Sequence, residues 1–195
     1  MTETSSPDAM TYRDVLGRFG SGVVVVAGMA GGGPAGLTCQ SFIAVSLNPP
    51  LVAVSPSIRS RSWRRIRPSG AFAVSVLTAQ QRQLCLTFAD GGGRDKFAAT
   101  GWHRAPSGSP VIDNALAWLD CRIESVQQAG DHFLVLARVE HLQGRSGEPL
   151  MFYRGGFGTF SADSAPGPRE PSRMDWTADD VWGTGLWQEI GRAHV

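Results

Sequence analysis

The sequence has no acidic residue between Asp14 and Asp90, whereas arginine recurs throughout that interval. One half of the chain is therefore a positive environment, although the formal net charge of the whole chain is only +1. So small a net charge provides no general attraction to nucleic acid or to an acidic membrane. Because arginine is the cation that best binds planar and phosphate anions, its concentration in this half indicates an anionic ligand.

The sequence also lacks the cysteine and histidine patterns of a disulfide framework or a metal site. Cys39, Cys85 and Cys121 are odd in number, widely spaced and set among apolar residues, which indicates free thiols in a reducing compartment. No serine lies in a nucleophile elbow, and no GxGxxG motif follows a predicted strand. We therefore expect no bound metal, no hydrolytic triad and no Rossmann-type dinucleotide site.

Long apolar runs are missing as well. No stretch approaches the roughly 20 apolar residues of a membrane helix, and the first residues, MTETSSPDAM, have neither the basic start nor the apolar segment of a secretory signal. We therefore expect a cytoplasmic protein without membrane contact. With 195 residues and 42% hydrophobic composition, the chain has enough apolar material for one domain with a real core.

The composition changes from Ser161 onward to proline, serine, glycine and charged residues. Such a composition is typical of a disordered tail, which we expect at residues 161–195. The final letters EIGRAHV can be encoded by the start of a widely used sequencing-adapter read, so we treat these last residues as a candidate assembly artefact.

Three short helices are predicted. TYRDVLGRFGSG, residues 11–22, has the spacing of an amphipathic helix that stops at glycine. A second helix should begin at Ser60 or Ser62 and end at the Pro68-Ser69-Gly70 stretch. A third should lie within residues 78–89, with Leu84, Leu86 and Phe88 on its apolar side.

The remaining apolar pattern predicts mainly β structure. Strands are expected at residues 23–27, 38–47, 51–55, 72–77, 117–126, 132–142 and 150–153. Many short strands separated by turns favour a small antiparallel β-barrel decorated by helices.

The stretch GLTCQSFIAVSLNPPLVAVSP, residues 36–56, is apolar enough to be core, yet it opens on the polar run Thr38, Cys39, Gln40 and Ser41. Beyond this run one face of the predicted strand is small, at Ala44 and Ser46, and the other is bulky and apolar. A small-residue face lets a flat ligand approach the backbone closely. Packing of another strand or helix against it is the more common explanation of such a pattern.

A second candidate site is the loop in which serines alternate with Arg59 and Arg61 just before a predicted helix start. Its serines are Ser55, Ser57, Ser60 and Ser62. Hydroxyl donors, guanidinium groups and free helix amides would together form a phosphate cradle. A serine-capped helix with a solvated basic face explains the same residues. RNA binding also fits in principle, although only Trp63 supplies a nearby aromatic side chain.

Two further motifs are weak when taken alone. In GDHF, residues 130–133, Gly130 and Asp131 suit a tight turn, and His132 begins a strand, where a lone histidine is usually structural. In FYRGGF, residues 152–157, aromatic residues and an arginine stand beside glycines at a strand end, which is a common ending.

Taken together and in this order, these segments resemble the short-chain flavin reductases. Members of that family are FMN-binding split-barrel proteins that serve as reductase components of two-component flavin-dependent monooxygenases. The resemblance spans about residues 10–160 and rests on FGSGVVVV, GLTCQSFIAVSLNPPLVAVSP, SRSW, SGAFAVSVL, DKF, GSPVIDNALAWLDC, GDHF and FYRGGF. It implies one antiparallel split β-barrel domain over these residues. TCQSF, SRSW and FYRG are most similar to reductases paired with oxygenases that hydroxylate phenols and steroid phenols.

The resemblance implies that the protein binds a flavin, FMN or FAD, which NADH or NADPH reduces and which a flavin-dependent oxygenase then uses. It also implies a homodimer with the flavin near the subunit interface. The polar run would face the isoalloxazine edge, the serine loop would hold the ribityl chain and phosphate, and the DKF stretch would close the site. These implied flavin contacts are Thr38, Cys39, Gln40, Ser41, Ser55, Ser57, Ser60, Arg61, Ser62, Lys96 and Phe97.

The same resemblance assigns the nicotinamide side of the site. His132 would take part in the hydride-transfer step, and it would border the nicotinamide together with Tyr153, Arg154 and Gly155. Phe157 is the candidate for an aromatic residue that stacks there.

Three functions are therefore compared. An NAD(P)H:flavin oxidoreductase needs only to align two cofactors, so it explains a site of Ser, Thr, backbone amides and Arg without a nucleophile. A flavin-binding or storage module on the same barrel would retain flavin tightly without turnover. An RNA-binding barrel would show strongly salt-dependent binding, but GDHF and FYRGGF have no purpose in it.

Overall fold

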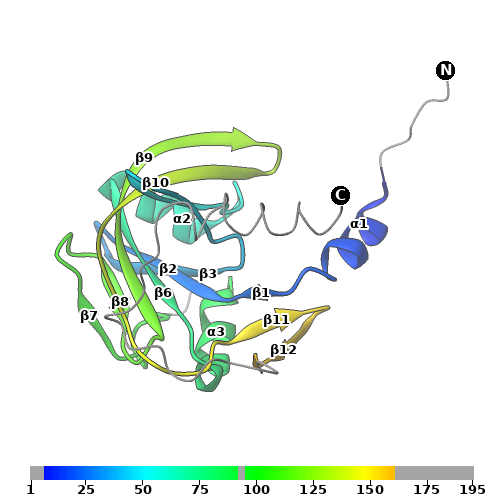
Figure 1. Ribbon diagram of the computed structural model, residues 1–195. Coiled ribbons are helices and arrows are strands. Elements are labelled where there is room, and N and C mark those ends of the chain that lie inside the picture. Colours follow the sequence, from blue (N-terminus) through cyan, green and yellow to red (C-terminus); the bar gives the residue numbers. More distant parts are fainter. Residues whose placement is uncertain (1–6, 92–94, 161–195) are drawn as a thin grey trace, which may run out of the picture.

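A seven-stranded antiparallel sheet forms the body of the protein (Figure 1). The computed structural model describes residues 7–91 and 95–160, so the predicted tail lies outside the described residues. In spatial order the strands are β3 (Gly33–Cys39), β2 (Val24–Ala30), β6 (Ala71–Val76), β9 (Ala117–Ala129), β10 (His132–Gly144), β5 (Pro50–Val54) and β4 (Ile43–Leu47). The predicted mainly β fold with helices is confirmed.

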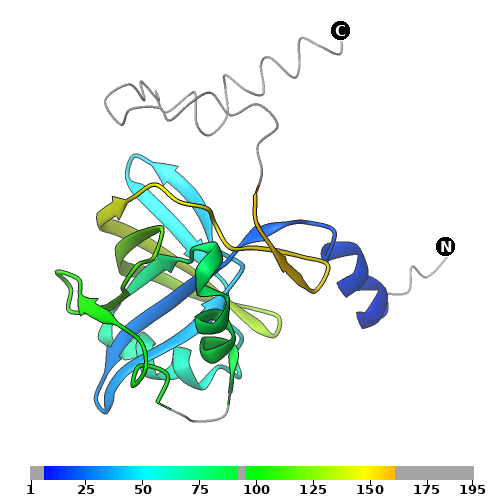
Figure 2. The same ribbon diagram turned by 90° about the horizontal axis from the view of Figure 1, so that it is seen from below.

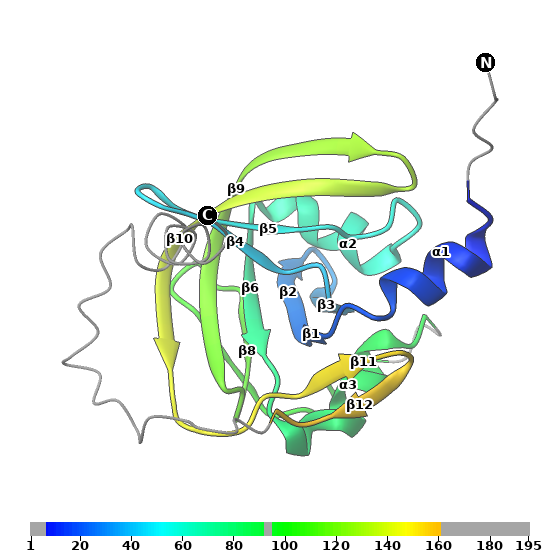
Figure 3. The same ribbon diagram turned by 45° about the vertical axis from the view of Figure 1, so that its right-hand side comes forward.

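The two edges of this sheet are consecutive in the chain. β3 and β4 stand at opposite ends of the strand order, yet only residues 40–42 join them (Figure 3). So short a link brings the two edges together at one end, and the sheet therefore curls into an open barrel. The split of the barrel is the opening between the edge strands β3 and β4, and the polar run at residues 38–41 lies there.

Strand β2, which lies next to the edge strand β3, is buried on both faces, and this explains its run of valines. Val24 and Val26 point into a core that contains Trp63 and Ile66 of α2 (Arg61–Ile66). Val23 and Val25 belong to a second core beneath α3 (Arg82–Ala89). A one-turn 3-10 helix, η1 (Arg67–Ser69), directly follows α2. Another, η2 (Ala79–Gln81), directly precedes α3. The α2 and α3 helices thus pack on opposite faces of the sheet.

The helix predictions are confirmed in position but only partly in orientation. Ser60 caps α2, and Gly70, with φ of 70°, ends the helical stretch. In α3 the buried residues are Cys85 and Phe88, whereas Leu86 is 43% exposed. The predicted apolar side was therefore wrong at Leu86, because alternate positions do not share one helix face. All three cysteines are buried free thiols, as predicted.

The predicted strand at residues 38–47 is wrong as a single element. It is interrupted at residues 40–42, so its first part ends β3 and the rest forms β4. The pairing of β4 with β5 shifts register between Ala44 and Ser46, yet exposure still alternates along β4: Ala44 and Ser46 are half-buried, and the bulky residues between and beside them are exposed. The glycine-rich stretch at residues 28–36 is mostly strand, because the turn between β2 and β3 takes up only residues 31–32.

Four short strands were not predicted, because two or three residues carry no periodicity. They are β1 (Ser21–Gly22), β7 (Trp102–Arg104), β8 (Pro110–Ile112) and β12 (Gly156–Gly158). β7 pairs with β8, while β1 and β12 flank β11 (Met151–Tyr153) in a separate sheet. Figure 2 shows the β11–β12 hairpin beside the connection from α1 (Ala9–Leu16) to β1.

The first helix, α1, extends from the body of the protein and buries none of its residues. Asp8 caps it by accepting hydrogen bonds from the backbone amides of Met10 and Thr11. Its amphipathic pattern therefore leaves Val15 and Leu16 about half exposed, at 56% and 52%. Within the described residues, no helix has the length and apolar character needed to cross a membrane.

Candidate active site

A cavity of about 1330 Å³ lies between β3, α2, the end of α3 and the start of β10. Its wall brings together most of the residues predicted to form the site. The predicted residues that line it are Thr38, Cys39, Gln40, Ser41, Ser55, Ser57, Ser60, Arg61, Ser62, Lys96, Phe97 and His132. Segments that are up to about a hundred residues apart in the sequence therefore form one surface.

The hydroxyl groups of the polar run are bonded within the protein. Thr38 donates its hydroxyl to the carbonyl of Cys85 in α3, at 2.8 Å. The Ser41 hydroxyl oxygen accepts from the amide of Ser55 at 2.9 Å and lies 2.9 Å from the Cys39 sulfur. Because β3 is an edge strand, its outward backbone groups have no partner strand in the sheet. The backbone, more than these hydroxyls, can therefore contact a ligand at this wall.

The serine loop is held in shape by its own hydroxyl oxygens. Ser57 accepts a hydrogen bond from the amide of Arg59 at 3.2 Å, and Ser60 accepts one from the amide of Trp63 at 3.1 Å. A hydroxyl that accepts such a bond still has its proton to donate. These two serines can therefore support the loop and donate to an anionic oxygen at the same time.

Four cationic side chains line the cavity, namely Arg59, Arg61, Arg65 and Lys96, and the last three donate hydrogen bonds to backbone carbonyls. The Arg61 guanidinium donates to the carbonyl of Gly91, and that of Arg65 lies 3.5 Å from the carbonyl of Gly33. The Lys96 ammonium donates to the carbonyls of Phe88, at 2.7 Å, and Gly36, at 3.3 Å. Burial lowers the pKa of Lys96; the charge of Arg61 adds to this effect, while that of Asp90 opposes it. Lys96 thus ties the end of α3 to β3.

Phe97 supports the same wall from behind. It is only 5% exposed and packs edge-to-face on Phe88, with ring centroids 5.0 Å apart. The Phe88 ring lies so close to β3 that a Cβ at Gly36 would come within 2.6 Å of it. Glycine at position 36 is therefore required for α3 to pack against the cavity wall.

His132 stands where the GDHF turn meets the serine loop. The amide of Phe133 donates to the carbonyl of Pro56 at 2.9 Å, and the amide of Ile58 donates to that of Asp131 at 3.0 Å. The imidazole Nδ1 lies 2.8 Å from the Asp131 carboxylate, and this hydrogen bond lowers the pKa of Asp131. The side chain of His132 is 44% exposed at the cavity. It is therefore oriented by a neighbour and open to a ligand.

Comparison with known families agrees with this arrangement. The model of the flavin reductase like domain matches residues 16–161. The chain belongs to the flavin reductase family. Its resemblance to that family, inferred from short motifs, is thus confirmed.

Several relatives in this family cover nearly the same length. The reductase subunit HsaB of a flavin-dependent monooxygenase from Rhodococcus jostii is 43% identical over 182 residues, which cover 90% of this chain and 92% of that protein. A flavin reductase from Pseudomonas putida is 44% identical over 160 residues, with 81% and 94% covered.

Solved structures show the same fold. Nitrilotriacetate monooxygenase component B from Mycobacterium thermoresistibile is 38% identical, with a TM-score of 0.77 over 91% of this chain and 96% of that one. The NADH:FAD oxidoreductase SgcE6 from Streptomyces globisporus, in complex with NAD and FAD fragments, is 35% identical, with a TM-score of 0.77 over 84% and 100%.

In this flavin reductase, the predicted residues Tyr153, Arg154 and Gly155 do not line the cavity of the single chain. They form the turn between β11 and β12, where the amide of Arg154 donates to the carbonyl of Gly17 at 2.9 Å. Arg154 also lies 3.8 Å from the carboxylate of Asp14 in α1. The turn therefore contacts the end of the helix that supplies Tyr12 and Leu16 to the cavity.

Sequence reasoning missed other residues of the cavity wall. Tyr12 and Leu16 reach it from α1, and Arg65 reaches it from α2, four positions after Arg61. Helical spacing could have identified Arg65, because residues four apart lie on one side of a helix. No local signal points to the two α1 residues, since their place depends on where α1 lies in the fold. Ala44 and Ser46, the predicted small face, do not line the cavity.

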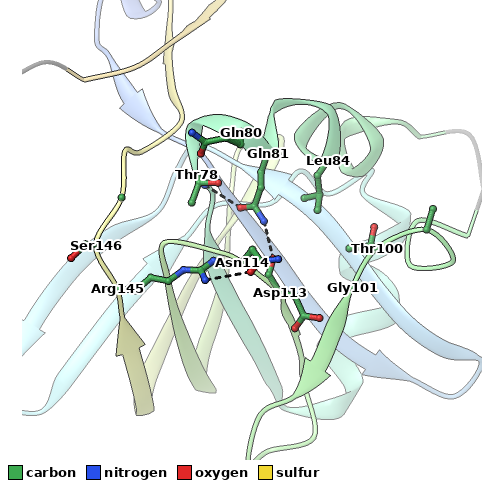
Figure 4. A pocket seen from close by; sticks show the side chains of 12 residues that line it. Thr78, Gln80, Gln81, Leu84, Thr100, Gly101, Asp113, Asn114, Arg145 and Ser146 are labelled. Carbon is green, nitrogen blue, oxygen red and sulfur yellow. Dashed lines mark hydrogen bonds between the residues drawn. The ribbon is translucent and has the colours of Figure 1, made fainter.

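A second cavity of about 630 Å³ lies near α3 and the end of β10, and no predicted site residue lines it (Figure 4). Its polar groups bond to one another. The Gln81 amide donates to the carbonyl of Asp113 at 2.9 Å, and Arg145 donates to Asn114 at 3.4 Å. The larger cavity is therefore the candidate active site.

Proposed function

We propose that this protein transfers a hydride from NADH or NADPH to FMN or FAD and supplies the reduced flavin to a separate flavin-dependent oxygenase. The observation that carries the proposal is the single cavity, which unites the polar run, the serine loop, the cations and His132 in a chain of the flavin reductase family. Relatives are named as reductase subunits of flavin-dependent monooxygenases and as an NADH-dependent FMN reductase.

The residues of the cavity fit a flavin. A flavin combines a flat ring that has a polar edge with a phosphate, and this wall offers edge-strand backbone, serine hydroxyls and guanidinium groups. Thr38, Cys39, Gln40 and Ser41 are proposed to face the ring edge, with Lys96 and Phe97 behind that wall. Ser55, Ser57, Ser60, Arg61 and Ser62 are proposed to hold the ribityl chain and phosphate.

Hydride transfer between the nicotinamide and flavin rings is chemistry that the two cofactors supply themselves. The protein's task is to align them, and holding reactants at reacting distance can supply much of the rate. We propose that His132 positions the nicotinamide, because its imidazole borders the cavity and Asp131 fixes its orientation. Tyr153, Arg154 and Gly155 are proposed to border the nicotinamide from the side of the cavity where α1 lies.

We further propose that the protein works as a homodimer in the cytoplasm. The exposed apolar residues of α1, of the segment that follows it and of β4, among them Leu16 at 52%, Phe19 at 82% and Ile43 at 57%, are surfaces that a second copy would cover. A phenol- or steroid-phenol-hydroxylating oxygenase is the proposed user of the reduced flavin. Purification of an oxygenase encoded beside this gene, followed by assay of the pair on phenols, tests that assignment.

The central test is NADH oxidation by the purified protein with and without added FMN or FAD. We expect the nicotinamide absorbance to decrease only when a flavin is present. Absence of flavin-dependent oxidation with NADH and NADPH contradicts the proposal. Tight stoichiometric flavin binding without turnover would instead indicate the storage module, which the reductase names of the relatives do not favour.

A further inference from the structure

The aromatic side chains of the main cavity differ in what they offer to a flat ligand. Tyr12, Phe88 and Phe97 all line it. Phe88 and Phe97 are only 1% and 5% exposed and pack edge-to-face on each other, so the protein itself covers their rings. Tyr12, in contrast, is 55% exposed. Among the tyrosine, phenylalanine and tryptophan residues that the structure describes on this wall, Tyr12 is therefore the one whose ring is open to a ligand.

Phe157, which the sequence suggested as the stacking residue, is engaged elsewhere. Its ring centroid lies 5.2 Å from that of Phe152 and 5.3 Å from the guanidinium carbon of Arg82. Phe157 does not line the cavity of the single chain. The aromatic contact expected at the nicotinamide therefore has to be sought at another position on the cavity wall.

The helix that carries Tyr12 is held in place at its C-terminal end. Because α1 buries none of its residues, its position depends on the β11–β12 turn, where the amide of Arg154 donates to the carbonyl of Gly17 at 2.9 Å. The Arg154 guanidinium also lies 3.8 Å from the Asp14 carboxylate, and β1, which follows the helix, pairs with β11. Tyr12 and Leu16 are four positions apart, so these contacts turn one side of α1 toward the cavity.

The location of Tyr12 indicates which of the two rings it contacts. The polar run and the serine loop are proposed to hold the flavin, whereas His132 and the turn at residues 153–155 are proposed to border the nicotinamide. Tyr12 lies on the side of that turn, because Arg154 anchors the end of its helix. A phenol ring that packs on another flat ring gains dispersion and quadrupole attraction. Tyr12 is therefore placed to contact the nicotinamide.

We propose that Tyr12 packs against the nicotinamide ring of the hydride donor and holds it toward the flavin. This inference rests on the proposed function. Leu16, one turn further along α1, supplies an apolar contact beside it. Tyr12 thus helps to align the two rings, and its hydroxyl takes no part in the hydride transfer.

The test compares Tyr12→Ala, Tyr12→Phe and Val15→Ala. Val15 is the matched control, because it lies on the same helix, is 56% exposed and does not line the cavity. The dissociation constant for FMN is measured by quenching of flavin fluorescence, and that for NAD⁺ by calorimetry on the FMN-loaded protein. KM for NADH is measured with FMN as acceptor. Since α1 buries no residue, all three variants should fold, and circular dichroism melts check this.

We expect Tyr12→Ala to weaken NAD⁺ binding and to raise KM for NADH by about two- to tenfold, the range of one aromatic contact. Its affinity for FMN should be unchanged, because the flavin is held at the polar run and the serine loop. Tyr12→Phe should resemble wild type, since it keeps the ring. Val15→Ala should change none of these values.

Four results overturn the assignment of Tyr12. They are a Tyr12→Ala variant indistinguishable from wild type, a loss of FMN affinity in that variant as large as its loss of NAD⁺ affinity, an equal effect of Val15→Ala, and a Tyr12→Phe variant as impaired as Tyr12→Ala. Oxidation of NADH by the wild-type protein in the presence of FMN tests the proposed function separately. The assignment of Tyr12 can therefore fail while the reductase activity is still observed.

Discussion

The backbone amide of Ser55 donates a hydrogen bond to the hydroxyl oxygen of Ser41 at 2.9 Å, and the Ser41 hydroxyl lies 3.2 Å from the carbonyl of Ser55. Ser41 belongs to the link between β3 and β4, and Ser55 follows β5. This pair therefore joins the polar run to the serine loop at the split of the barrel, and it fixes the distance between two walls of the proposed flavin site.

Ser41→Ala should loosen this connection. Loss of the hydroxyl removes bonds worth about 0.5–1.5 kcal/mol of stability each in a typical protein, less here because Ser41 is exposed. We expect the thermal midpoint to fall only slightly. The dissociation constant for FMN should rise and should be the more sensitive measurement of the two. Ser46→Ala on β4 is the matched control, because the structure shows no side-chain hydrogen bond at Ser46 among the described residues. Unchanged FMN affinity in Ser41→Ala would show that the connection does not shape the site.

Ser60 has two roles that different substitutions separate. As the N-cap of α2 it accepts from the Trp63 amide, and Ser→Ala at such a position costs about 1 kcal/mol of stability. Ser60→Asp preserves the cap but places a negative charge where the flavin phosphate is proposed. We expect Ser60→Asp to melt near the wild-type temperature while FMN affinity falls by about tenfold or more, which is roughly 1.4 kcal/mol. If Ser60→Asp binds FMN as tightly as wild type, the phosphate lies elsewhere.

Gly36 tests how closely α3 packs behind the cavity wall. A Cβ at this position would lie 2.6 Å from the Phe88 ring, which is buried and cannot move aside freely. Gly36→Ala should therefore destabilise the protein by about 1–3 kcal/mol, as overpacking does in other cores. Gly31→Ala, which meets no atom within 4 Å, is the control and should melt near the wild-type temperature. Urea denaturation of the two variants measures the difference.

Much of this site was predictable because its signals are local. The serine loop and the start of α2 follow from a capping serine, and the GDHF turn follows from glycine and aspartate at adjacent positions. The break at residues 40–42 and the register shift after Ala44 carry no such signal, because they depend on how β3 and β4 pair with strands that lie elsewhere in the sequence. Tyr12 shows the same limit. It reaches the cavity only through the position of α1, which no spacing of residues within that helix specifies.

Lys96 should make stability depend on pH in alkaline solution. Burial lowers its pKa in the folded protein from the usual 10.5, so the unfolded chain binds more protons between the two values. Stability attributable to this group should therefore rise as pH increases through that interval, and it should be lowest below the folded pKa. Lys96 is the only lysine in the sequence, so Lys96→Met should remove this component. Urea midpoints of both proteins from neutral pH to pH 10.5 measure it, and parallel pH profiles would contradict the assignment.

His132→Ala is expected to affect the nicotinamide step rather than flavin binding. The imidazole borders the cavity and is oriented by Asp131, whereas the flavin phosphate is proposed to lie at the serine hydroxyls. Loss of one hydrogen bond of about 0.5–1.5 kcal/mol corresponds to a rise in KM for NADH of roughly two- to tenfold, with unchanged FMN affinity.

His103→Ala is the matched control, because His103 is similarly exposed and bonds Asp113 at 2.7 Å, away from this cavity. Because both variants lose one imidazole paired with an aspartate, an effect specific to His132 reflects its position at the cavity. Equal kinetics in the two variants would leave His132 with a structural role at the GDHF turn.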